Sequence, residues 1–141
     1  DACVELDIPI VAHSGRDLGS TQYSEPRAYG DVYEAFPALK LVMAHLGNGS
    51  WRQTKEVEDA FPNALFDTSE ITEWHGAPLA PTREELARLI RDIGPERVMM
   101  GTDFPWWSPA HCVQGIMDMP VLSQSEKEAI LGANAARILG I

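Results

Sequence analysis

The stretch Leu39-Lys-Leu-Val-Met-Ala-His-Leu-Gly47 is an almost wholly apolar run that ends in a histidine and a glycine. A run that is apolar at successive positions, rather than at alternate ones, is typical of a strand in a parallel sheet that is covered on both faces. The stretch therefore predicts a buried parallel strand at residues 39–46, with His45 at its carboxyl end.

The same pattern occurs three more times along the chain. Apolar runs that end in polar residues predict strands near residues 8–14, 64–69 and 97–103. The spacing of the strands suits βα units of about 30 residues, and no low-complexity linker divides them. We therefore expect an α/β fold with parallel strands, in a single domain over residues 1–141.

Helices are expected between the strands. Thr82 and Glu85 form a capping box, in which each side chain accepts a hydrogen bond from the backbone of the other residue. The apolar residues that follow recur with the helical period up to Ile93. We expect Ser50 and Ser125 to start two further helices in the same way.

Composition narrows the classes of partner. The chain has 11 basic and 21 acidic residues and a formal net charge of −10 at pH 7. Nucleic acid and anionic membranes carry charge of the same sign, so we expect neither as a partner, and small molecules are favoured. The sequence has no apolar run of about 20 residues and no signal-peptide pattern at its start, which favours a cytoplasmic protein.

Each predicted strand ends in a residue capable of chemistry. These residues are, in turn, His13, His45, the segment from Asp67 to Ser69, and Asp103. Active sites of parallel α/β folds form at the carboxyl ends of the strands. Two imidazoles and a carboxylate suit Zn²⁺ and similar divalent ions, and a catalytic metal keeps one position open for a water molecule that it activates. We therefore expect a catalytic metal site at this edge of the sheet.

Other residues near the strand ends are candidates for binding. Arg16 is a candidate clamp for a substrate carboxylate, Ser69 is a candidate substrate contact, and Trp106 is a candidate wall of the pocket. The loop 47–50, Gly-Asn-Gly-Ser, precedes a predicted helix and is a weaker candidate for binding an anion at the helix N-terminus. It lacks the lysine of a phosphate-binding P-loop.

Five segments together resemble a known family, namely the amidohydrolase-related metal-dependent enzymes with a TIM-barrel fold. The branch that they resemble contains aminocarboxymuconate-semialdehyde decarboxylase and related aromatic-acid decarboxylases. The segments are Ile8-Pro-Ile-Val-Ala-His13, the run that ends in His45-Leu-Gly47, Phe66-Asp-Thr-Ser69, Arg97-Val-Met-Met-Gly-Thr-Asp-Phe-Pro-Trp106, and Gly132-Ala-Asn-Ala-Ala-Arg-Ile-Leu139.

This resemblance implies roles for three of the residues at the strand ends. His13 and Asp103 would bind a divalent metal, for which zinc is expected. His45 would act as the acid or base in catalysis, and Asp103 would also accept a proton. The implied reaction is hydrolysis or non-oxidative decarboxylation of a small carboxylate or cyclic substrate by a metal-activated water.

The resemblance extends only to the C-terminal half of the family's barrel, that is, to four of its βα units. None of the four predicted strands ends in the His-x-His or Glu-x-His metal motif of the family's first strand. Four units leave two unpaired strand edges, which favours association. The alternative hypothesis is therefore a non-catalytic half-barrel that needs a missing N-terminal half or self-association into a homo-oligomer.

Overall fold

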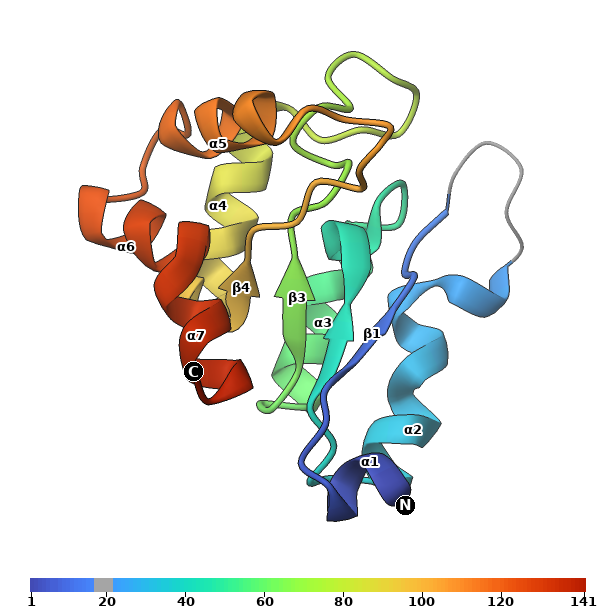
Figure 1. Cartoon of the computed structure of the whole chain (residues 1–141). Coiled ribbons are helices and arrows are strands. Elements are labelled where there is room, and N and C mark those ends of the chain that lie inside the picture. The colour runs from blue at the N-terminus through green and yellow to red at the C-terminus, as the bar shows by residue number, and fades with distance from the viewer. Residues whose placement is uncertain (17–21) are drawn as a thin grey trace.

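The computed structural model describes residues 1–16 and 22–141. Its sheet has four parallel strands in the order of the sequence, so that each strand pairs with the next one along the chain (Figure 1). The strands are β1 (Ile10–Ala12), β2 (Leu41–Met43), β3 (Leu65–Asp67) and β4 (Val98–Met99). Each lies within its predicted range but is shorter. The predicted α/β fold with four parallel strands is confirmed.

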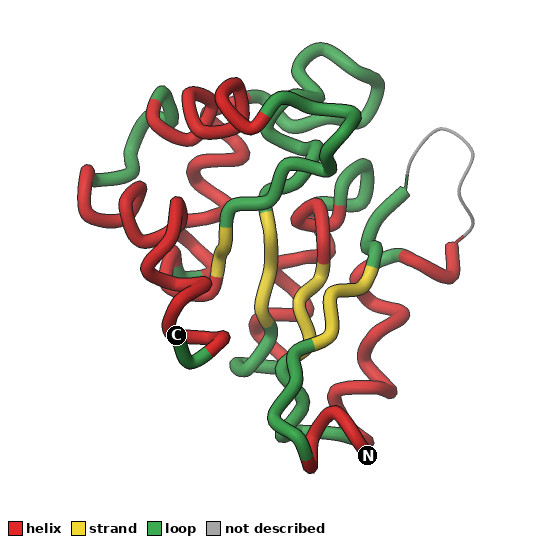
Figure 2. Tube along the Cα trace, in the orientation of Figure 1, coloured by secondary structure: helices red, strands yellow, loops and turns green. Residues whose placement is uncertain are grey.

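Helices follow each strand and continue to the C-terminal end, where a π-turn at Ala129–Ala133 joins the last two. In Figure 1, α2, α3 and α4 lie behind the sheet and α7 lies in front of it, beside β4. Figure 2 shows that most loop segments gather at the upper end of the strands. The helices are α1 (Ala2–Glu5), α2 (Gly30–Ala35), α3 (Arg52–Ala60), α4 (Arg83–Ile93), α5 (Pro109–Met117), α6 (Gln124–Glu128) and α7 (Asn134–Leu139).

The hydrophobic core lies between the sheet and helices α2, α3 and α4. Phe66 of β3 is fully buried there, and in the sheet it pairs with Met43 and Val98, which are buried in the same core. Leu86 and Ile90 of α4 pack into this core with exposed fractions of 1% and 0%. This side of the sheet therefore has the complete covering that its apolar strands predict.

The other face of the sheet is only partly covered. Val42 and Met99 are buried under Ile138 of α7. Beside them lies a cavity of about 180 Å³ that extends to Val11. The side chain of Val11 is 65% exposed, because nothing in the described part of the chain covers the β1 end of this face. In a closed barrel this face would point to the interior.

Of the three helix starts predicted from capping patterns, one is confirmed and two differ in the structure. The capping box of Thr82 and Glu85 is present at the start of α4. The corresponding box of α6 uses Ser123 with Glu126, so the predicted start at Ser125 is wrong by two residues. Ser50 caps no helix: the N-cap residue of α3 is Trp51, and the Ser50 hydroxyl donates to the carboxylate of Glu25.

No helix within the described ranges 1–16 and 22–141 is both long and apolar enough to cross a bilayer.

Candidate active site

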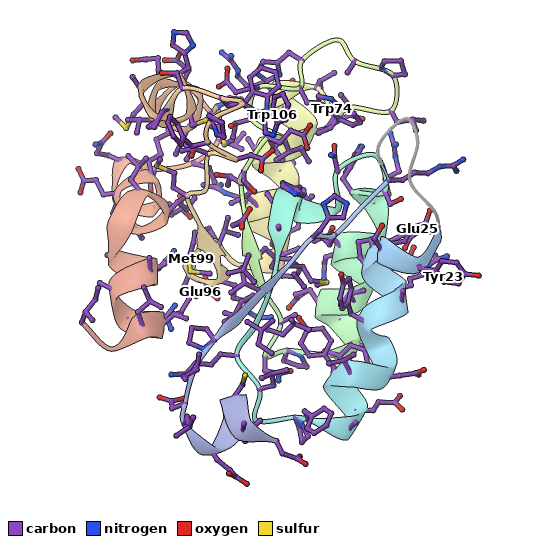
Figure 3. The ribbon with its side chains drawn as sticks, turned by 45° about the vertical axis from the view of Figure 1, so that its right-hand side comes forward. Tyr23, Glu25, Trp74, Glu96, Met99 and Trp106 are labelled. Atoms are coloured by element: carbon purple, nitrogen blue, oxygen red, sulfur yellow. The ribbon has the colours of Figure 1, made fainter. Side chains whose placement is uncertain are left out.

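A cleft of about 330 Å³ opens at the carboxyl ends of the strands. Figure 3 shows Trp106 at this end of the molecule, above the strand that carries Met99. The cleft is lined by two imidazoles, two carboxylates and two indoles, which belong to His13, His45, Glu70, Asp103, Trp106 and Trp107. The loops after all four strands therefore contribute to one cavity.

His13 directly follows β1 and lies against His45. The centroids of the two imidazole rings are 5.0 Å apart, with 62° between the ring planes. The hydroxyl of Tyr29 donates to the backbone oxygen of His13. Burial raises the pKa of Tyr29, so the phenol keeps the proton that it donates at neutral pH. This contact holds the backbone of His13 at the cleft.

The loops after β1 and β2 are in direct contact. The Ser14 hydroxyl donates to the backbone oxygen of Ala44 at 2.5 Å, in a buried position. Gly15 has a φ of +116°, and a Cβ placed there would lie 2.3 Å from the backbone oxygen of Gly47. Only glycine allows this approach of the two backbones. The spacing of the two imidazoles is thus set by the packing of their loops.

His45 is held by the segment that follows β3. Its Nδ1 lies 2.8 Å from the hydroxyl oxygen of Ser69 and 3.1 Å from the backbone oxygen of the same residue. The carboxylate of Asp67 accepts three hydrogen bonds through Oδ1, from the backbone N–H groups of His45 and Ser69 and from the Ser69 hydroxyl. His45 is 7% exposed, and Ser69 is 6% exposed.

Space for this cluster comes from a glycine after β4. A Cβ at Gly101 would lie 2.8 Å from the Cβ of Ser69 and 3.2 Å from the Cγ of Asp67. The first distance is shorter than real Cβ atoms show, so any larger residue would displace Ser69, which holds His45. The Gly101 position therefore connects the last strand to the orientation of His45.

Two carboxylates face the same cleft. Asp103 lies in the loop after β4, and its backbone oxygen accepts a hydrogen bond from the N–H of Trp106 at 3.0 Å. Glu70 follows Ser69, and its carboxylate accepts a hydrogen bond from the side-chain amide of the fully buried Asn48 at 2.9 Å. Glu70 is thus fixed at the rim by a residue of the neighbouring loop.

Three of the residues lining the cleft have left-handed backbones. The φ angles are +64° at His45, +61° at Glu70 and +56° at Asp103. For a residue other than glycine, this conformation costs about 1–2 kcal/mol. Strained residues of this kind cluster at functional sites, where the surrounding structure holds them. The strain at these three positions favours a functional role for the cleft.

The structure brings together four of the residues named from the sequence, namely His13, His45, Asp103 and Trp106. The Ser69 hydroxyl contacts His45 and Asp67, so its predicted contact with substrate stays a prediction. Arg16 does not line the cleft.

The backbone oxygen of Arg16 accepts from the N–H of Gly49, and its side chain is exposed. The predicted role of this side chain in binding a carboxylate also stays a prediction. The loop 47–50 is largely buried, and its Ser50 hydroxyl is bonded to Glu25, so these residues present no open cradle for an anion.

Glu70 was not singled out from the sequence, and Asp67 was named only as part of the polar segment 67–69 at the end of the third run. Glu70 directly follows that segment, which was the available signal. The contact of Glu70 with Asn48 depends on the left-handed turn at Glu70, which the sequence pattern does not reveal.

The donor set for a metal is incomplete within the described residues. His13 and Asp103 supply one imidazole and one carboxylate, which are ligands that suit Zn²⁺ and Mn²⁺. In residues 1–16 and 22–141, no group of three or more His, Cys, Asp and Glu side chains is arranged to hold a metal ion. The cleft thus fits a divalent ion in the type of its donors but not in their number.

Comparison with known families matches the amidohydrolase family over residues 1–141. The chain belongs to the amidohydrolase family, as its resemblance predicted. A 2-amino-3-carboxymuconate-6-semialdehyde decarboxylase from Dictyostelium discoideum is 30% identical over 128 residues, covering 80% of this chain and 34% of the relative.

Solved structures share the fold at lower identity. An uncharacterized TIM-barrel protein from Bordetella bronchiseptica has a TM-score of 0.74 and 23% identity, over 99% of this chain and 48% of that chain. A dihydroxybenzoic acid decarboxylase from Polaromonas sp. JS666, solved with bound manganese and the inhibitor 2-nitroresorcinol, has a TM-score of 0.70 and 16% identity. That match covers 98% of this chain and 51% of the decarboxylase.

The chain therefore spans about a third of the length of the Dictyostelium relative and about half of each solved structure. Its four parallel strands correspond to half of the eight strands of a TIM barrel.

Proposed function

We propose that this chain supplies the acid–base half of a metal-dependent active site that removes CO₂ from a small carboxylate-bearing substrate. The observation that carries the proposal is the cleft in which His13, His45 and Asp103 meet. The similarity to decarboxylases favours decarboxylation among the reactions that this family catalyses. The substrate class that we propose is that of aromatic and muconate-like acids.

His13 and Asp103 would hold the divalent ion, with zinc or manganese as candidates. When bound, such an ion supplies a Lewis acid that polarises substrate oxygens. These two residues are half of the usual four ligands, so further donors must come from the strands that complete the barrel. The half-barrel alternative follows from this requirement. In that alternative, the chain is inactive until a second half-barrel covers its open face.

His45 would transfer the proton. Decarboxylation replaces the C–COO⁻ bond of the substrate by a C–H bond, so an acid must deliver one proton to the carbon atom that loses CO₂. His45 lies in the wall of the cleft with Nδ1 turned to Ser69, which leaves Nε2 as the ring nitrogen for this transfer. Trp106 and Trp107 would cover the substrate and exclude water from it.

Hydrolysis is the second candidate function, because the same groups could serve it. In that case His45 or Asp103 would accept a proton from the attacking water rather than deliver one to carbon. The two reactions differ in product, since only decarboxylation releases CO₂.

The test has two parts. In the first, Mn²⁺ and Zn²⁺ binding to the chain is measured by calorimetry for the wild type and for His13→Ala and Asp103→Ala. We expect both variants to lose most of the affinity, while His111→Ala, a change of a histidine outside the cleft, leaves it unchanged. Unchanged metal affinity in His13→Ala would refute the metal assignment.

In the second part, the protein that contains these residues in a closed barrel is assayed with 2-amino-3-carboxymuconate-6-semialdehyde and with 2,6-dihydroxybenzoate. We expect metal-dependent release of CO₂ that is lost in His45→Ala. Metal-dependent turnover of a cyclic amide or ester without release of CO₂ would favour hydrolysis over decarboxylation as the function. Metal-free protein that turns over nothing and forms stable oligomers would favour the non-catalytic half-barrel.

A further inference from the structure

We propose that Asp67 and Ser69 are positioning residues that keep the proton of neutral His45 on Nδ1 and so reserve Nε2 for the substrate. The proposal rests on the proposed function in one respect, which is that His45 is the residue that transfers the proton. The arrangement of the three side chains is independent of any substrate.

The first argument concerns the backbone oxygen of Ser69, which lies 3.1 Å from Nδ1 of His45. A carbonyl oxygen can only accept a hydrogen bond. If Nδ1 lacked a proton, two lone pairs would face each other in a buried position. The contact is therefore favourable only when Nδ1 carries the proton.

The second argument concerns the Ser69 hydroxyl, whose oxygen lies 2.8 Å from the same nitrogen. A hydroxyl can donate or accept, so by itself it would fit either form of the imidazole. Asp67 removes this freedom, because its carboxylate accepts the single hydroxyl proton. The lone pairs of the Ser69 oxygen are then left for the proton on Nδ1. The chain of donors thus runs from His45 to Ser69 and from Ser69 to Asp67.

The third argument concerns the rigidity of Asp67. Its Oδ1 also accepts the backbone N–H of His45 at 3.0 Å and that of Ser69 at 2.9 Å. The two backbone bonds fix the carboxylate relative to both residues that it orients. Charge-assisted bonds of this kind are stronger than bonds between neutral groups. The side chain of Asp67 therefore cannot turn away without breaking contacts to two loops.

Burial makes the arrangement hard to replace by solvent. His45 is 7% exposed and Ser69 is 6% exposed. Gly101 leaves room for the carboxylate and the hydroxyl but for no additional side chain. A second hydrogen-bond partner for Nδ1 would have to enter a closely packed region. The tautomer of His45 is thus determined by Asp67, Ser69 and Gly101 of this chain, whatever completes the barrel.

As a result, the two ring nitrogens of His45 have different roles in the proposed reaction. With Nδ1 protonated, neutral His45 offers a lone pair at Nε2 and can accept a proton from the cleft. The protonated imidazolium delivers that proton from the same atom. The opposite tautomer would present an N–H to the cleft and could not act as a base there. Ser69 and Asp67 act on the reaction through His45, without touching the substrate.

The test measures the tautomer directly. The chain is labelled with ¹⁵N-histidine, and the ¹⁵N chemical shifts of the His45 ring are recorded with the ring neutral. We expect the wild type to carry the proton on Nδ1. Ser69→Ala removes the nearer acceptor, and the loss of one hydrogen bond should shift the ratio of the two tautomers by about fivefold toward Nε2–H.

Two variants of Asp67 separate geometry from charge. Asp67→Asn keeps an acceptor oxygen and is expected to retain the wild-type tautomer. Asp67→Ala frees the Ser69 hydroxyl to donate to Nδ1 and is expected to shift the ratio toward Nε2–H, against the backbone oxygen of Ser69, which still favours a proton on Nδ1. Tyr33→Phe is the matched control, since it also removes a buried hydroxyl that donates to a backbone oxygen, that of Leu41, and should leave His45 unchanged. Circular dichroism checks the folding of each variant.

The proposal is overturned if wild-type His45 carries its proton on Nε2, or if Ser69→Ala gives the same tautomer ratio as Tyr33→Phe. In the active, closed-barrel protein, Ser69→Ala should lower kcat about tenfold and change KM less than twofold. If the wild type shows no activity but the tautomer follows these expectations, the proposed function fails while the positioning role of Ser69 and Asp67 stands.

Discussion

The helix-covered face of the sheet and the rim of the cleft are built in opposite ways. On the covered face, α4 begins with a capping box, and Ile90 is fully buried in the core. At the rim, His45 and Asp103 have left-handed backbones, and Trp106 is 80% exposed. On the covered face, the backbone conformations that the residues prefer agree with the tertiary packing. At the rim, the two conflict.

This difference separates the region that carries stability from the region in which we propose the active site. Agreement between local and tertiary preferences makes a fold robust. A rim that contains strained backbone is stable only because the covered face supports it. Substitutions on the covered face should therefore change the free energy of unfolding, while substitutions at the rim should change the site.

The largest effect is expected from two aromatic residues truncated in parallel. Phe66→Ala removes a fully buried ring from the core and should lower the free energy of unfolding by about 3–5 kcal/mol. Trp106→Ala removes an 80% exposed ring at the rim and should change it by about 0.5 kcal/mol or less. Urea unfolding followed by circular dichroism measures both. Equal losses would contradict the division between the two regions.

A smaller effect is expected at the point where the two regions meet. Gly101→Ala places a Cβ 2.8 Å from the Cβ of Ser69, which must move. Such overpacking costs about 1–3 kcal/mol and should also alter the ring environment of His45. The control is Gly132→Ala, because nothing lies within 4 Å of a Cβ at Gly132. An unchanged ¹⁵N spectrum of His45 in Gly101→Ala would show that the cluster tolerates displacement.

Helix caps on the covered side should contribute about 1 kcal/mol each. Thr82→Ala removes a side chain that accepts the N–H of Glu85, and the melting temperature should fall accordingly. Ser108→Ala is the matched control, since Ser108 precedes α5 without a side-chain capping bond. A comparable loss in both variants would mean that the capping bond is not the cause.

The smallest effect is a pH dependence of stability from the two capping glutamates. Hydrogen bonds from Thr82 and Ser123 lower the pKa of Glu85 and Glu126 below the ordinary value of 4.5. A carboxyl group with a lowered pKa in the folded state stabilises the protein above pH 4.5 and loses this contribution as the pH falls through the folded-state value. Melting temperatures at pH 7 and pH 3 measure it.

The double variant Glu85→Gln, Glu126→Gln isolates the contribution, because other carboxylates also titrate in this range. Its melting temperature should fall less than that of the wild type between the two pH values. A larger fall in the double variant would contradict the sign of the effect.

The sequence predicted the elements whose local signals agree with their packing. The four apolar runs became the four strands in the expected parallel arrangement, and the box at Thr82 was confirmed. The start of α6 was misplaced because Ser123 with Glu126 and Ser125 with Glu128 both fit the same pattern. The helix uses the first pair, and the pattern alone does not distinguish the two.

The sequence predicted which residues form the site better than it predicted the contacts between them. His13, His45 and Asp103 were named because strand ends of a parallel sheet share one edge. The contact of Ser69 with His45 was not predictable, because it depends on backbone angles after β3 that no pattern in this sequence specifies. The same is true of Glu70, whose position follows from its left-handed turn and from Asn48.

The close contact between Gly15 and Gly47 has a consequence for how this protein can change. Because the two backbones touch, a residue inserted into either loop would shift His13 and His45 together rather than one at a time. The loop that carries Trp106 and Trp107 is free of this contact, so changes there would alter the cleft without moving the two histidines.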